Sequence, residues 1–254
     1  MSPPLPVIVS LLRAWGAYVL LLLRVIATFG RSQGQLTAWL AQLHRIGARS
    51  LPIIATAGAF TGMVVAVQFF DTLVRFGSRG LLGTAVGLSL IRELGPVLTA
   101  LITIGRAGSA SCAEMAIMRT DQQIDAIECM AIDPYAYLLA PRLLAFLIAL
   151  PLLTAIFEVF GICGGVVVAW SSFGESPRLY LANMADGVLA RDLLMSLLKS
   201  GVFGLLIGWL CLGKGYLSAG QAGAEGVSRT TTDAVVLASL AVLFIDYVLS
   251  ALLL

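Results

Sequence analysis

Five charged side chains interrupt long apolar stretches of this sequence and are the first candidates for chemistry: Arg92, Glu93, Glu158, Lys199 and Asp246. Arginine can hold a phosphate through two hydrogen bonds, lysine meets it as a point charge, and carboxylates neutralise neighbouring cations. Two interpretations stay open. The charges pair with one another and fix how helices pack, or some of them contact a lipid headgroup. We expect Asp246 to act mainly as support and Glu158 to neutralise a neighbour.

A second candidate is the charged, helix-compatible segment between residues 106 and 142. At about 100° per residue, four acidic side chains fall within about 60° of one another, beside an apolar face; they are Glu114, Asp121, Asp125 and Glu128. Asp133 precedes a proline and would end the helix, because that position disfavours helical conformation. The pattern predicts one amphipathic helix with an acidic ridge. It is either a solvated helix packed on the remaining chain or a docking element for a soluble partner.

Other familiar site chemistry is poorly supported. The four cysteines form no CxxC pair, and His44 is the single histidine, so no metal site is expected. The run from Gly208 to Lys214 resembles the start of a phosphate-binding loop, but Gly215 stands where that motif needs Ser or Thr. We therefore expect no catalytic residue and no cofactor in this chain.

The elements that carry these residues are membrane spans. Of 254 residues, 59% are hydrophobic and 12% charged, and the mean hydropathy is +0.96, whereas soluble domains carry about twice that charged fraction. A bilayer core needs about 20 apolar residues per helix. Five segments satisfy this requirement, at approximately 52–74, 81–105, 142–170, 193–213 and 233 to the C-terminus.

The segment from about residue 5 to 29 is apolar but is cut by Arg13 and Arg24, which can reach the headgroups from a helix lying in the interface. Ten Lys and Arg residues flank the spans on the N-terminal side of the membrane and four on the other. The positive-inside rule then places the N-terminus in the cytoplasm and, after five spans, the C-terminus outside.

Glycine pairs at GxxxG spacing occur in four of the predicted spans, and this spacing lets helix backbones approach closely in lipid. They are Gly58/Gly62, Gly83/Gly87, Gly161/Gly165 and Gly204/Gly208. The pattern predicts a compact all-α bundle, with an oligomer interface as a further possibility.

Three segments carry a resemblance to a known family: IRELGPVLTALITIGRAGSA, AEMAIMRTDQQIDAIECMAIDPYAYLLAPR and GVSRTTTDAVVLASLAVLFIDYVLSALL. In this order they resemble the MlaE/YrbE family of ABC-transporter permeases, which work with MCE-domain proteins. The similarity runs from about residue 45 to the end of the chain.

The resemblance implies an N-terminal interfacial helix region at 1–50 and a five-span permease domain at 51–254. It implies a homodimer in the bacterial inner membrane, with a cytoplasmic ABC ATPase dimer that binds ATP and Mg. A periplasmic MCE-domain hexamer and a STAS-domain subunit are further implied partners. The implied cargo is phospholipid, moved between the inner and outer membranes.

In this family the loop helix, here within 106–141, couples the permease to its ATPase. The implied coupling residues are Glu114, Arg119, Asp121, Asp125, Glu128 and Asp133. The family's lipid pocket lies at the dimer interface, and the matching segments carry Arg92, Glu93 and Lys199 into it, with Asp246 nearby.

Without the resemblance, other functions compete. An ion-coupled secondary transporter would use Glu93, Glu158 and Asp246 as ion sites, but it predicts internal repeats that the five spans do not show. An intramembrane enzyme would need a nucleophile with a base or a metal pair. A membrane anchor for an MCE ring would need neither transport nor coupling.

Overall fold

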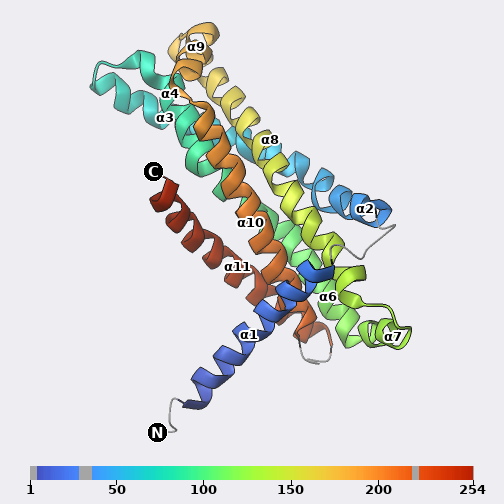
Figure 1. Cartoon of the computed structure of the whole chain (residues 1–254). Coiled ribbons are helices and arrows are strands. Elements are labelled where there is room, and N and C mark those ends of the chain that lie inside the picture. The colour runs from blue at the N-terminus through green and yellow to red at the C-terminus, as the bar shows by residue number, and fades with distance from the viewer. Residues whose placement is uncertain (1–4, 29–35, 219–222, 254) are drawn as a thin grey trace.

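The computed structural model describes residues 5–28, 36–218 and 223–253, and this part of the chain is helical without strands. The long helices that follow α1 (Leu5–Thr28) run roughly along one axis, which α1 crosses (Figure 1), and α4 (Leu82–Ser89) and α9 (Pro177–Gly187) lie at one end. At the other end lie α6 (Ser109–Thr120) and α7 (Gln123–Cys129). The two ends are called the α9 end and the α7 end below.

Five helical stretches in the described residues are long and apolar enough to cross a membrane, as the sequence predicted. Two of them are single helices, α10 (Ala190–Tyr216) and α11 (Ala224–Leu253). The first contains α3 (Leu51–Arg75), and the third contains α8 (Ala140–Phe173). The predicted all-α fold with five spans is confirmed, and an apolar helix α1 (Leu5–Thr28) precedes them.

The second span is longer than expected, because it continues from Leu82 to Thr120 instead of ending near 105. Two π-helical segments, Leu90–Leu94 and Ile104–Gly108, separate α4, α5 (Gly95–Thr103) and α6. Proline removes one backbone donor, and the first π segment ends directly before Gly95-Pro96, so the widened turn absorbs the proline without ending the helix.

Glycines bring the spans together. A methyl group at Gly62 of α3 would overlap the backbone of Gly161 in α8, and one at Gly204 of α10 would overlap that of Phe146 in α8. These contacts confirm the close packing predicted from GxxxG spacing. The fifth span is covered least, with 11% of its apolar window buried, compared with 50% in α8 and α10.

The predicted single amphipathic helix between residues 106 and 141 is wrong, because α6 and α7 form a helix–turn–helix. Gln122 adopts a left-handed conformation with φ 57°, which interrupts the helical path. Arg119 then bridges the turn to Asp125 at 2.8 Å. Asp133-Pro134 does not end the helix either, because α7 already stops at Cys129 and Ala131 is left-handed.

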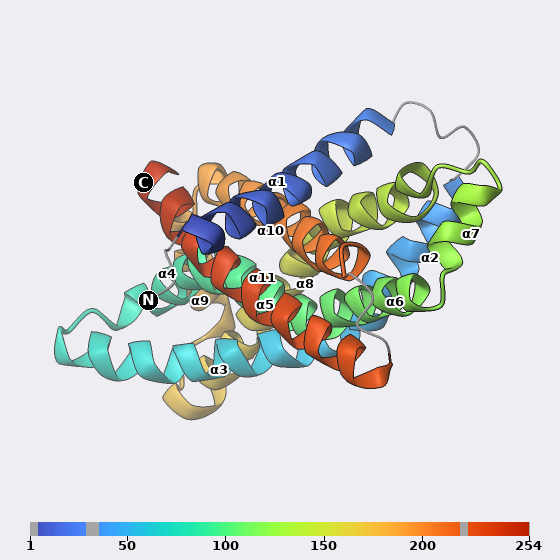
Figure 2. The ribbon, with the colours of Figure 1, turned by 90° about the horizontal axis from the view of Figure 1, so that it is seen from below.

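The helical stretch of the first span begins at Thr37, before the predicted start near residue 52, because it includes a helix that the sequence did not predict. The unpredicted helix α2 (Leu36–Ile46) packs against α8. The view from below shows α1 crossing α10 at the outside of the bundle (Figure 2), and the Trp209 indole donates to the Tyr18 carbonyl at 2.8 Å. Among the side chains of α1 that the structure describes, seven large apolar ones are exposed, which suits a helix in contact with lipid; they are Val9, Leu12, Trp15, Val19, Leu20, Leu23 and Ile26.

Candidate functional site

Lys199 is the centre of an ion-pair cluster that joins three spans. Its Nζ atom lies 2.9 Å from Glu93 Oε2 of the second span and 3.2 Å from Asp246 Oδ1 of α11. The ammonium also donates to Ser250 Oγ at 2.8 Å and to the Arg92 carbonyl at 2.9 Å. Since an ammonium has three donors and the side chain is 3% exposed, Lys199 is surrounded by acceptors that compete for its protons.

Arg92 has a different partner, which the sequence did not reveal. Its Nε and Nη2 atoms both lie 2.8 Å from Oδ1 of Asp192. The Asp192 side chain is 2% exposed, and its other oxygen accepts from the Leu189 backbone N–H at 2.9 Å, which satisfies a donor at the start of α10. Asp192 lies two helical turns before Lys199, so both project from the same face of α10.

Glu158 occupies a separate position. The Ser196 hydroxyl donates to its Oε1 atom at 2.5 Å, and the residue is 7% exposed. The expectation that Glu158 neutralises a cation is therefore wrong, because in the described chain its partner is this hydroxyl. Its side chain also lies close to Gly95, where a Cβ atom would stand 2.9 Å from Glu158 Cγ.

Accessibility divides the cluster into a buried part and an open part. The side chains of Lys199 and Asp192 are almost fully buried and Asp246 is 18% exposed. Arg92 and Glu93 are 38% and 44% exposed. Lys199 pairs with Glu93 and Asp246, as one interpretation of the sequence predicted, whereas Arg92 pairs with the unpredicted Asp192. The two most exposed residues of the cluster, Arg92 and Glu93, are adjacent in sequence.

The acidic residues predicted as one ridge separate into two groups at the α7 end. Glu114 accepts from Arg45 of α2 at 2.6 Å and pairs with Arg142 of α8 at 3.2 Å, which ties three helices together. The other predicted acids, Asp121, Asp125, Glu128 and Asp133, are exposed, and Arg119 pairs with Asp125. The break at Gln122 separates Glu114 and Asp121 from Asp125 and Glu128.

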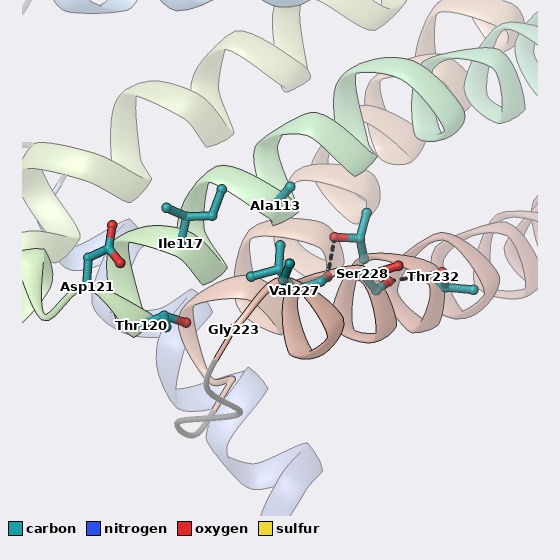
Figure 3. A pocket seen from close by; sticks show the side chains of 10 residues that line it. Ala113, Ile117, Thr120, Asp121, Gly223, Val227, Ser228 and Thr232 are labelled. Atoms are coloured by element: carbon teal, nitrogen blue, oxygen red, sulfur yellow. Dashed lines mark hydrogen bonds between the residues drawn. The ribbon is translucent and has the colours of Figure 1, made fainter.

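A groove of about 570 Å³ lies between α6 and the first turns of α11. Figure 3 shows Ala113 and Ile117 of α6 facing Val227 and Ser228 of α11, with Asp121 at the rim. Lys214 pairs with Asp233 of α11 at 3.2 Å. The run from Gly208 to Lys214, which resembles the start of a phosphate-binding loop, is part of the membrane-spanning helix α10.

Comparisons with known proteins agree on one kind of protein. Residues 39–252 match the family described as Permease MlaE. The chain is 40% identical to the intermembrane phospholipid transport system permease protein MlaE of Haemophilus influenzae, over 83% of this chain and 80% of that protein. It is 36% identical to a probable ABC transporter permease protein of Rickettsia felis, over 93% and 91% of the two chains. The chloroplastic protein TRIGALACTOSYLDIACYLGLYCEROL 1 of Arabidopsis thaliana is 32% identical over 84% of this chain and 60% of its own length.

Proposed function

Because this chain belongs to the Permease MlaE family, we propose that it moves phospholipid between the inner and outer membranes. It is a multi-pass permease subunit of an ABC transporter and not an enzyme, so ATP and Mg belong to a separate ATPase subunit. The observation that carries the cargo proposal is the charged cluster at Arg92 and Glu93, which is open within otherwise apolar spans. Polar groups at membrane depth are costly and mark substrate pathways.

Within this cluster we assign different roles to the predicted site residues. Arg92 and Glu93 contact the lipid headgroup, because their side chains are partly exposed. Lys199 and Asp246 position Glu93, since the buried Lys199 ammonium contacts acceptors of both the second and the fifth span. Acyl chains of the cargo would lie along the apolar surfaces of the spans.

The α6–α7 hairpin is the proposed contact with the ATPase. Its exposed acids Asp121, Asp125 and Glu128, with Arg119 and the following Asp133, form a charged surface at the α7 end. Glu114 supports this hairpin by anchoring α6 to α2 and α8 and does not itself meet the partner. Force from ATP hydrolysis would then enter at α7 and pass along the second span to Arg92 and Glu93.

The assembly around this chain follows the family. We propose a homodimer in the inner membrane, with the N-terminus cytoplasmic and the C-terminus periplasmic, an interfacial region at 1–50 and a permease domain at 51–254. A periplasmic MCE-domain hexamer would exchange lipid with the permease, and a STAS-domain subunit would be a further partner. The low burial of the fifth span supports this proposal, because a helix that packs against a second chain is left uncovered within one subunit.

Reconstitution tests the function directly. The chain, purified with its ATPase and MCE partner in donor vesicles, should transfer labelled phospholipid to acceptor membranes only when ATP is present. Arg92→Ala and Glu93→Ala should each lower transfer about tenfold or more, because a hydrogen bond to a charged group is worth about 1.5–3 kcal/mol. Arg178→Ala, at an exposed arginine of α9, is the matched control and should transfer normally.

Assembly must be measured beside transfer, by size-exclusion chromatography and thermal unfolding of each variant. If both variants assemble and transfer lipid at the wild-type rate, the headgroup assignment is wrong. If the wild-type complex hydrolyses ATP but never transfers lipid, the chain anchors the MCE ring and does not form a lipid path.

A further inference from the structure

We infer that the Arg92–Glu93 site selects a zwitterionic headgroup with a primary ammonium, such as phosphoethanolamine, over an anionic headgroup. The inference rests on the proposed lipid transport function and specifies its cargo. The phosphate would bind the Arg92 guanidinium, and the ammonium would bind the Glu93 carboxylate.

Charge balance is the first argument. The cluster holds two cations, Arg92 and Lys199, and three carboxylates, Glu93, Asp192 and Asp246. With every group ionised, the described cluster carries one net negative charge, because Lys199 is shared by Glu93 and Asp246. An uncompensated charge is expensive at membrane depth. A headgroup with net negative charge would increase the imbalance, whereas a zwitterionic headgroup, whose net charge is zero, leaves it unchanged and places its ammonium beside the Glu93 carboxylate.

The distribution of exposure is the second argument. Lys199 already donates to several acceptors and its side chain is buried, so its ammonium is not available to a phosphate. The accessible groups are one cation and one anion, Arg92 and Glu93. A site that offers both signs to its ligand fits a ligand that carries both signs.

Spacing is the third argument. Arg92 is held at Asp192 and Glu93 at Lys199, two positions that lie seven residues, or about 10 Å, apart along α10. The phosphate and ammonium of phosphoethanolamine are separated by two carbons. The inference places one end of this headgroup at the guanidinium and the other at the carboxylate, each with a charge-assisted hydrogen bond of about 2.8 Å.

Hydrogen bonding decides between ammonium types. Arg92 has five N–H donors, of which Nε and Nη2 are engaged with Asp192 in the described chain, so others remain for a phosphate. Glu93 accepts from Lys199 and Ser250 and keeps further lone pairs for a primary ammonium. A trimethylated ammonium has no N–H group, so it would bind Glu93 more weakly.

A competition transfer assay tests the inference. Donor vesicles would contain equal amounts of labelled phosphatidylethanolamine, phosphatidylcholine and phosphatidylglycerol in a neutral background lipid, with the complete transporter and ATP. We expect transfer of phosphatidylethanolamine to exceed that of phosphatidylglycerol about tenfold, as a charge-assisted hydrogen bond predicts. Glu93→Gln should reduce this preference to about twofold or less while the complex stays assembled.

Glu175→Gln, which makes the same chemical change at the α9 end outside the cluster, should keep the wild-type preference. Equal transfer of all three lipids by the wild type, unchanged in Glu93→Gln, would overturn the selectivity and leave the transport function intact. A preference for phosphatidylglycerol would overturn it as well, and would point to a proton as the group that balances the cluster. No transfer of any lipid, with normal ATP hydrolysis, would instead refute the proposed function.

Discussion

At the scale of single residues, Asp192 shows how a buried partner can control an exposed functional group. It holds Arg92 by two contacts to one oxygen and the start of α10 by the other oxygen. We expect Asp192→Ala to lower the free energy of unfolding by about 1–3 kcal/mol, because the Leu189 backbone N–H at the start of α10 and part of the Arg92 guanidinium lose their acceptor. Lipid transfer should fall as well, since Arg92 is no longer positioned.

Thermal unfolding and transfer by the purified complex measure both effects. Asp192→Asn keeps an oxygen for the Leu189 N–H but removes the charge, so it should retain more stability than Asp192→Ala. Asp186→Ala, at an exposed acid of α9, should leave both quantities unchanged. Equal effects at positions 192 and 186 would show that the buried ion pair has no special role.

At the scale of helices, the α3–α8 contact depends on the absence of side chains. A Cβ atom at Gly62 would overlap the Gly161 backbone, so the helices must separate to admit it. Gly62→Ala should destabilise the protein by about 1–3 kcal/mol, the usual range for overpacking. Gly201→Ala in α10 meets nothing within 4 Å and serves as the control in a thermal unfolding assay. A stable Gly62→Ala variant would mean that α3 is held elsewhere.

The α6–α7 hairpin separates structural from coupling acids. Glu114→Ala should reduce stability, since it leaves the buried Arg142 and its neighbour Arg45 without their shared carboxylate. Glu128→Ala, at an exposed site on α7, should leave stability unchanged and reduce co-purification of the ATPase. Quantitative pull-down beside thermal unfolding distinguishes the two effects. Loss of the ATPase in Glu114→Ala without any loss of stability would reverse these assignments.

Helical elements were more predictable than their partners. Hydropathy located the five spans, because a bilayer imposes a minimum apolar length on each. The charged residues inside the spans were also evident from the sequence, because they interrupt these apolar segments. Periodicity could not reveal that Arg92 pairs with Asp192, 100 residues away, or that Glu114 meets Arg45, because such pairs depend on packing between helices. The break at Gln122 was missed because nothing in the residue type demands a left-handed backbone there.

At the scale of the whole molecule, the third span, Tyr135–Phe173, lies between α7 and α9 in the chain, so these two helices are expected on opposite sides of the membrane. The proposed orientation places α7 in the cytoplasm. Cys129 of α7 is exposed, Cys112 and Cys211 are buried, and Cys163 lies within a span. In a Cys163→Ser background, a membrane-impermeant thiol reagent should label Cys129 in inverted inner-membrane vesicles but not in intact spheroplasts. A cysteine introduced as Glu175→Cys at the α9 end should show the opposite pattern once Cys129 is replaced by serine, and labelling of Cys129 in spheroplasts would invert the proposed topology.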